Sequence, residues 1–162
     1  MSSWQCMICG GTGFVDRGRK ADYTLCQCVR CGTVTIDPLP TAEELARLYT
    51  EYSSTPGYLI KREKKLRRSR RRLVRLRRLA PGKRLLDVGC NLGYTVAAGN
   101  ALGMEARGID IDPATIAQAK ELFGAEHFEA VTVEDFARRG EKFDMVYTAE
   151  TIEHTLDPVS YT

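Results

Sequence analysis

From residue 83 onward the chain alternates short apolar segments with helical segments, joined by short connections. This order favours a parallel sheet, because parallel neighbours need a crossover helix rather than a hairpin. The sequence therefore predicts an α/β fold, a Rossmann-like parallel sheet of about four strands with flanking helices. The predicted strands span 84–88, 105–109, 127–131 and 143–148, and the predicted helices span 94–102, 113–123 and 135–138.

The cysteines are unevenly distributed, with five before residue 32 and Cys90 alone in the α/β part. Four of the five form two C-x2-C-G motifs with 18 residues between them, a spacing typical of a structural zinc site. Cys26 lies outside both motifs and is not a predicted ligand. Reduced buried cysteines or a redox pair are the alternatives. The duplicated motif favours structural Zn²⁺ in a zinc-ribbon-like module, with Cys6, Cys9, Cys28 and Cys31 as its ligands.

Two prolines, Pro38 and Pro40, close the cysteine-rich region. Thr41 and Glu44 then have the spacing of a helix capping box. We expect a zinc-binding module over 1–40, a helical linker with a basic helix over 41–80, and the α/β domain over 81–162.

The net charge of +3 combines two unlike parts. Residues 61–78 carry twelve Lys or Arg and one acidic residue, a local charge of +11, which leaves the rest of the chain at −8. We interpret 58–79 as a helix that packs on the sheet and exposes a solvated basic face. The alternative is an anion-binding face for a nucleotide-linked sugar, a phospholipid-like acceptor or RNA. The apolar stripe of this helix comprises Leu59, Leu66, Leu73, Leu76 and Ala80.

The ends of the chain raise two further expectations. No apolar run approaches the roughly 18 residues of a membrane-spanning helix, and none at the N-terminus resembles a signal sequence, so we expect a cytoplasmic protein. The last predicted strand is apolar and nothing in the sequence covers its outer edge, so we expect the domain to be C-terminally truncated at Thr162. A chain of this length is then expected to be poorly soluble or inactive.

A glycine turn follows the first predicted strand, in the segment LLDVGCNLG. Such a turn brings backbone N–H groups and a helix N-terminus against a ligand. Asn91 stands at the middle glycine position of the dinucleotide pattern, and Asn tolerates left-handed backbone better than most residues. Asp87, two residues before Gly89, would repel a pyrophosphate but can hold a cationic group, directly or through water.

Acidic residues also follow the next two strands. Asp110 ends the second strand about 20 residues after the turn, where an acid binds ribose hydroxyls, although it could instead cap the next helix with Asp112. Asp135 and Phe136 follow the third strand, where a carboxylate and a ring could contact an adenine. A nucleoside that carries a positive charge fits this set, which predicts S-adenosylmethionine as cofactor.

The motifs LLDVGCNLGYTV, ARGIDIDPATI, VEDF and FDMVYTAETIEHTLDP resemble, in order, those of class I S-adenosylmethionine-dependent methyltransferases. The Glu-His pair followed by Asp-Pro is typical of their small-molecule branch, which includes ubiquinone-biosynthesis-like enzymes. The N-terminal C-x2-CG and CVRCGTVTIDPLPTAEELARLY segments are similar to the zinc-binding module that precedes such domains, including sugar C-methyltransferase-like proteins.

The resemblance implies a methyltransferase that acts on a small-molecule or carrier-linked acceptor, a sugar or a quinone-like compound, with the zinc module shaping the acceptor side. It implies Asp87, Gly89, Cys90 and Gly93 around the methionine moiety, Asp110 on the ribose, Ile111 on the adenine, Asp135 and Phe136 on the amine and ring of the adenine, and Glu150 near the sulfonium.

Two functional alternatives stay open at this point. His154 and Glu153, the residue before it, are the candidate catalytic residues. His154 is the candidate base if the acceptor must lose a proton, and its alternative role is to hold the loop after the fourth strand. The second class of function is nucleic-acid binding through a zinc ribbon and the basic helix, or RNA methylation, with the α/β part as scaffold.

Overall fold

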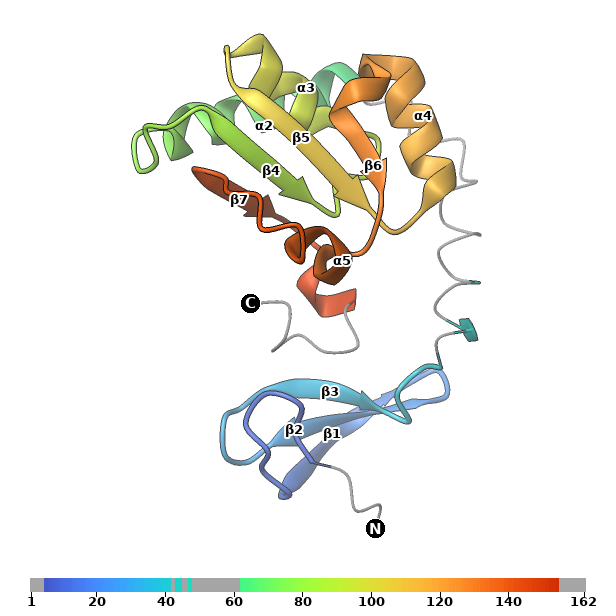
Figure 1. Ribbon diagram of the computed structural model, residues 1–162. Helices are drawn as coiled ribbons and strands as arrows, with labels where there is room; N and C mark the ends of the chain where they lie inside the picture. The colour runs from blue at the N-terminus through green and yellow to red at the C-terminus, as the bar shows by residue number, and fades with distance from the viewer. Residues whose placement is uncertain (1–4, 42, 45–46, 48–61, 155–162) are drawn as a thin grey trace. The chain divides into compact units, whose positions relative to one another are not determined.

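The structure is a computed structural model that describes residues 5–41, 43, 44, 47 and 62–154 (Figure 1). The described residues fall into two compact units, one on each side of residues 48–61. Each unit is described by itself below. Among the described residues, no helix is long and apolar enough to cross a membrane.

The N-terminal unit is a three-stranded antiparallel sheet in the order β1-β2-β3. Its strands are β1 (Phe14–Lys20), β2 (Tyr23–Cys28) and β3 (Val34–Asp37). Most side chains of β1 are exposed and charged, which is why hydropathy alone does not mark that strand.

The capping box after this sheet forms as the sequence indicates. The Thr41 N–H donates to the Glu44 carboxylate at 2.7 Å, and the Glu44 N–H donates to the Thr41 hydroxyl at 3.2 Å. Each side chain therefore satisfies a backbone donor that has no partner within the helix. The N-terminal part of the predicted basic helix, 58–61, lies outside the described residues.

The C-terminal unit is a four-stranded, fully parallel sheet in the order β6-β5-β4-β7, and it confirms the predicted fold class. Figure 1 shows the four strands side by side with their helices. The strands are β4 (Arg84–Val88), β5 (Glu105–Asp110), β6 (Phe128–Ala130) and β7 (Met145–Thr148). The helices are α2 (Arg62–Leu76), α3 (Tyr94–Ala101), α4 (Pro113–Phe123) and α5 (Val133–Ala137), with 3₁₀ turns at Ala125–His127 and Ile152–His154.

Two elements begin two residues away from their predicted starts because side chains intervene. Helix α5 begins at Val133 rather than 135, since the Thr132 hydroxyl accepts from the Asp135 N–H and caps the helix. Strand β7 begins at Met145 rather than 143. The Asp144 carboxylate there accepts from the Arg84 N–H at 2.8 Å, and the Phe143 ring lies against Phe136.

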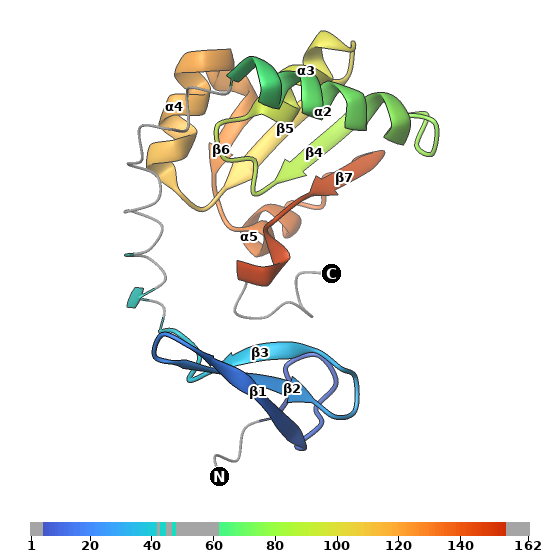
Figure 2. The same ribbon diagram turned by 180° about the vertical axis from the view of Figure 1, so that it is seen from behind.

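The core of this unit lies between the sheet and the helices α2, α3 and α4. Figure 2 shows α2 in front of the sheet, beside α3. Gly99 permits close packing of α3 on the strands, because a Cβ there would lie 2.9 Å from Ala106 Cβ and 3.1 Å from Leu85 Cδ2. Fully buried side chains include Leu73 of α2, Leu85, Val96, Ile109 and Ile116.

Candidate cofactor-binding site and metal centre

The turn after β4 has left-handed backbone at three of its five residues. Gly89, Asn91 and Gly93 have φ of 73°, 49° and 76°. Asn91 therefore adopts the conformation that glycine would supply in the dinucleotide pattern. Its side-chain oxygen also accepts from the Leu92 N–H at 2.7 Å, which stabilises that conformation locally.

The backbone donors of this turn are all used inside the protein. The N–H groups of Gly89 and Cys90 donate to the Ile109 carbonyl at 2.9 and 3.0 Å, and that of Gly93 donates to the Cys90 carbonyl. The Asn91 N–H donates to the Asp110 carboxylate at 2.9 Å. The expectation that these N–H groups face a ligand is thus wrong, because those of Gly89, Cys90 and Asn91 donate to β5 and the other two donate within the turn. The carboxyl groups of Asp87 and Asp110 lie at the ends of the strands beside this turn, and negative charge there disfavours a pyrophosphate.

Asp110 joins the turn to the end of β5. Its second oxygen accepts from the Asp112 N–H at 3.1 Å. Asp112, not Asp110, caps α4, since its carboxylate accepts from the Ala114 N–H at 2.9 Å. Asp110 therefore does not cap α4. Its carboxylate is fixed at the carboxyl end of the sheet, where open α/β sheets bind ligands.

Asp87 is a buried carboxylate at the same end of the sheet, with 4% of its surface exposed. Burial, and next the charge of Asp110, raises its pKa to about 8, although a hydrogen bond from Thr95 opposes the shift. The Thr95 hydroxyl also lies 3.3 Å from the Ser69 hydroxyl of α2. Sequence reasoning missed Thr95 and Ser69. The only signal in the sequence is for Thr95, a hydroxyl residue two positions after Gly93.

Thr151 is a second residue that the sequence did not single out. Its hydroxyl lies 3.4 Å from the Val88 carbonyl, and a Cβ on Gly89 would lie 2.3 Å from that hydroxyl oxygen. Thr151 therefore closes over the turn from the segment after β7. Glu150, just before it, has a left-handed φ of 58° and is exposed.

The three residues assigned to adenine lie in different environments. Ile111 is 58% exposed just after Asp110, as a surface for a base would require. Asp135 pairs with Arg138 and accepts from the Thr132 hydroxyl. Phe136 is 3% exposed, and its ring packs against Phe143, with the guanidinium groups of Arg107 and Arg139 over it.

The burial of Phe136 leaves no open ring face for an adenine, so its ring serves the core here. Cys90 behaves similarly. Its thiol is buried in the core and burial raises its pKa, so that only its backbone belongs to the turn.

Glu153 and His154 are exposed in the 3₁₀ turn after β7, and the His154 N–H donates to the Thr151 carbonyl at 2.9 Å.

The cysteine motifs of the N-terminal unit form two turns with the same hydrogen bonds. In the first, the Cys6 N–H donates to the Gly11 carbonyl and the Gly10 N–H donates to the Cys6 carbonyl. In the second, the Cys28 N–H donates to the Thr33 carbonyl and the Gly32 N–H to the Cys28 carbonyl. Both glycines are left-handed, with φ of 69° and 78°, which explains the glycine after each motif.

These turns bring four sulfurs into one cluster. The Sγ atoms of Cys6 and Cys31, and those of Cys9 and Cys28, are each 3.6 Å apart, and all four lie within 4.8 Å of one another. Tetrahedral Zn²⁺ with Zn–S bonds of about 2.3 Å places its sulfurs about 3.8 Å apart, so the cluster fits the ion. The Thr33 hydroxyl, and next its backbone, lowers the Cys31 pKa to about 6, which favours the thiolate.

The site combines a parallel α/β sheet with two carboxylates, Asp87 and Asp110, beside a glycine turn whose N–H groups have partners within the protein. A family model described as a methyltransferase domain matches residues 86–162. This part of the chain, slightly less than half of it, is similar to the methyltransferase domain family.

The chain is similar to enzymes named ubiquinone biosynthesis O-methyltransferase. It is 40% identical to that of Cereibacter sphaeroides over 84 residues, which cover 49% of this chain and 34% of the relative. The corresponding protein of Ruegeria pomeroyi is 38% identical over the same shares, and that of Hahella chejuensis is 37% identical over 49% of this chain and 36% of the relative. The chain thus spans about a third of the length of these relatives.

A solved structure, YjhP from E. coli, matches with 23% identity and a TM-score of 0.30, over 52% of this chain and 30% of that one.

Proposed function

We propose that the protein transfers a methyl group from S-adenosylmethionine to a small-molecule acceptor of the quinone-like kind. The observation that carries the proposal is the pair of carboxylates, Asp87 and Asp110, at the carboxyl end of the sheet beside a turn without free N–H donors. The family match to residues 86–162 supports the cofactor, and the names of the relatives support an oxygen atom on the acceptor. These matches favour an enzyme over the nucleic-acid-binding alternative.

S-Adenosylmethionine, when bound, supplies an electrophilic methyl group on a positively charged sulfur. In this proposal Asp87 balances the positive charge of the methionine end, and the backbone of Gly89, Cys90 and Gly93 lines that end. Asp110 accepts hydrogen bonds from the ribose hydroxyls. Each of its oxygens has a lone pair for this, because the Asn91 and Asp112 N–H groups use only one lone pair each. Exposed Ile111 contacts the adenine, and Asp135 its amine.

The residues after β7 face the acceptor in this proposal. Glu150 lies next to Thr151, which closes over the turn, and the exposed Glu153 and His154 follow. A neutral imidazole can accept the proton of an acceptor hydroxyl. We therefore assign His154 as the base and Glu153 as a second polar group of the acceptor side.

The N-terminal unit holds a structural Zn²⁺ in this proposal. Four thiolates leave no open coordination position for a substrate, so the ion stabilises the small β1-β2-β3 sheet. We propose the division of the chain into a zinc module over 1–40, a linker over 41–80 and the methyltransferase domain over 81–162, with the module contributing to acceptor choice.

Calorimetric titration of this chain with S-adenosylhomocysteine tests the cofactor assignment. We expect micromolar binding, and a loss of about 100-fold for Asp110→Ala, because hydrogen bonds to a charged group contribute about 1.5–3 kcal/mol each. Glu121→Ala removes an exposed carboxylate from α4 and is the matched control. Absence of binding, or an equal loss in both variants, would contradict the proposal.

A further inference from the structure

We propose that the outer face of α2 docks the protein on an acidic phospholipid surface. The inference does not depend on the proposed methyl transfer, since it concerns charges remote from the cofactor turn. The cationic face comprises Lys64, Arg67, Arg68, Arg71 and Arg75, all of them exposed.

The spacing places these side chains on one side of the helix. Lys64, Arg68, Arg71 and Arg75 follow one another at intervals of four, three and four residues, which is one stripe of an α-helix. Leu73 marks the opposite side, where it is fully buried against α3 and the sheet. The stripe extends about 16 Å along the helix at about 1.5 Å per residue.

Among the described residues, the basic side chains of the β4–β7 sheet form ion pairs with acidic side chains, and those of the cationic face do not. Arg107 lies 2.7 Å from Glu141 and 3.7 Å from Glu129, which in turn binds Arg139 at 2.5 Å. No ion pair within the described ranges includes a member of the cationic face. Neighbouring like charges destabilise a helix, so this arrangement matches an external anion.

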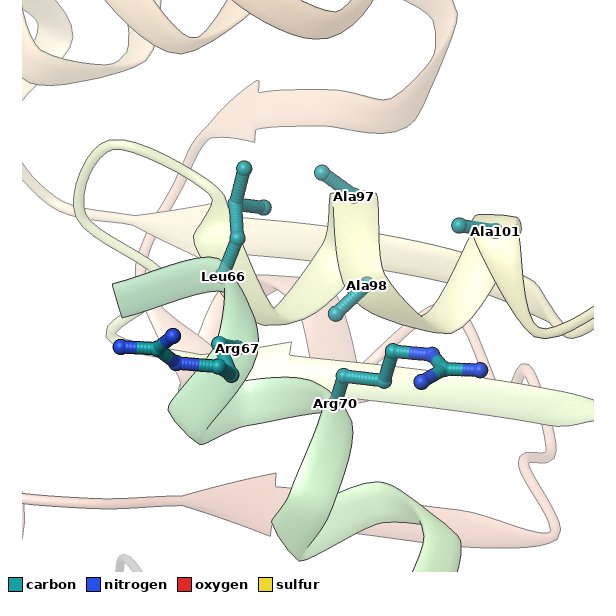
Figure 3. A pocket seen from close by; sticks show the side chains of 6 residues that line it. All are labelled: Leu66, Arg67, Arg70, Ala97, Ala98 and Ala101. Atoms are coloured by element: carbon teal, nitrogen blue, oxygen red, sulfur yellow. The ribbon is translucent and has the colours of Figure 1, made fainter. Parts of the chain in front are cut away.

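Apolar surface accompanies the cations, and this favours lipid over nucleic acid. Val74 is 43% exposed in α2 and Leu79 is 82% exposed in the turn after it. Figure 3 shows a shallow hollow where Leu66 and three alanines of α3 lie beside Arg67 and Arg70. Aliphatic side chains among cations suit the boundary between headgroups and acyl chains.

Among the described residues, two aromatic rings next to α2 are covered by cations of α2 itself. Arg62 lies over the Phe123 ring and Lys65 over the Tyr94 ring, and Tyr94 is buried. Binding of single-stranded nucleic acid relies on exposed rings together with positive charge. Within the part of the chain that the structure describes, the cationic face offers the charge without exposed rings, so an acidic bilayer is the better match.

Co-sedimentation with vesicles tests this docking surface on the full chain. We expect strong binding to phosphatidylcholine vesicles with about 30% phosphatidylserine, and weak binding to pure phosphatidylcholine. The triple variant Arg68→Gln, Arg71→Gln, Arg75→Gln should lower the partition coefficient by about 100-fold. The control Lys83→Gln, Lys120→Gln, Lys142→Gln removes the same charge from exposed positions elsewhere and should retain nearly all binding.

A second variant separates lipid from nucleic acid. Leu79→Ser should lower vesicle partitioning by about fivefold, because an inserted aliphatic side chain is lost, and should not alter affinity for a single-stranded RNA. Equal effects of the two triple variants would overturn the proposal. So would RNA binding that is tighter than vesicle binding at the same salt concentration. Titration with S-adenosylhomocysteine should be unchanged in every variant, which keeps this test distinct from that of the proposed function.

Discussion

At the scale of single residues, Asp87 has the most unusual chemistry in the α/β unit. A carboxyl with a raised pKa stabilises the fold when protonated, so its contribution is fully present below about pH 4 and is lost as the pH rises through about 8. A cationic ligand reverses this preference, because it stabilises the ionised form. The Thr95 hydroxyl, 3.3 Å from the Ser69 hydroxyl of α2, donates a hydrogen bond to this carboxyl group.

Cofactor affinity should therefore depend on pH through Asp87. Below pH 8 we expect the affinity for S-adenosylhomocysteine, whose ammonium group retains a positive charge, to rise about tenfold per pH unit, with release of a proton on binding. Titration in buffers of different ionisation enthalpy measures that proton. Asp87→Asn should bind weakly and lose the pH dependence between pH 6 and about pH 8, whereas Asp144→Asn, at the opposite end of β4, should keep it. A flat pH profile in the unaltered chain would refute this role.

At the scale of elements, the turn between β4 and α3 determines the geometry of the site. Its motif can be recognised in the sequence, and so can the strand before it and the helix after it. The hydrogen bonds of the turn to Ile109 and Asp110 are not, because they depend on the register of β4 with β5. Nor does the sequence show that Phe136 is buried, since an aromatic residue after a strand can face either way.

Substitution of two glycines separates backbone strain from close packing in this turn. Gly89 and Gly103 have nearly the same φ, 73° and 75°, but only Gly89 has a neighbour where a Cβ would stand. Gly103→Ala should lower the free energy of unfolding by about 1–2 kcal/mol from strain alone. Gly89→Ala should lower it by several kcal/mol, about 3 or more, because Thr151 must also move. Chemical denaturation measures both.

Removing the obstructing atoms provides a check on that explanation. Adding Thr151→Ala to Gly89→Ala deletes the oxygen and methyl that lie 2.3 and 2.7 Å from the new Cβ, and should recover part of the lost stability. Equal destabilisation by Gly89→Ala and Gly103→Ala would show that Thr151 does not constrain the turn.

At the scale of the whole molecule, the chain contains two units with different sources of stability. The α/β unit buries an apolar core that includes Leu85, Val96 and Ile116. The N-terminal unit has few buried apolar side chains, and the described buried ones there are Cys6 and Cys28. A unit this small generally needs a metal or disulfides to fold.

Metal removal should therefore unfold one unit and spare the other. We expect a zinc chelator, or Cys28→Ser, to abolish the dispersed amide resonances of β1–β3 in NMR spectra while those of β4–β7 persist. Cys26→Ser is the matched control, since Cys26 lies on β2 outside the cluster and should retain zinc. Persistence of the β1–β3 resonances after complete zinc removal would contradict a structural role for the metal.

The sequence by itself determined the order of elements, the parallel α/β class and the four clustered cysteines, because hydrophobic periodicity, glycine positions and motif spacing are local properties of a chain. Only the tertiary structure determined which polar groups have hydrogen-bond partners within the protein. In the folded chain, three N–H groups of the turn donate to β5, Asp87 is buried, Thr151 lies over Gly89 and Phe136 lies in the core. Hydrogen-bond satisfaction and desolvation depend on neighbours distant in sequence, so only the folded chain settles which groups remain for a ligand.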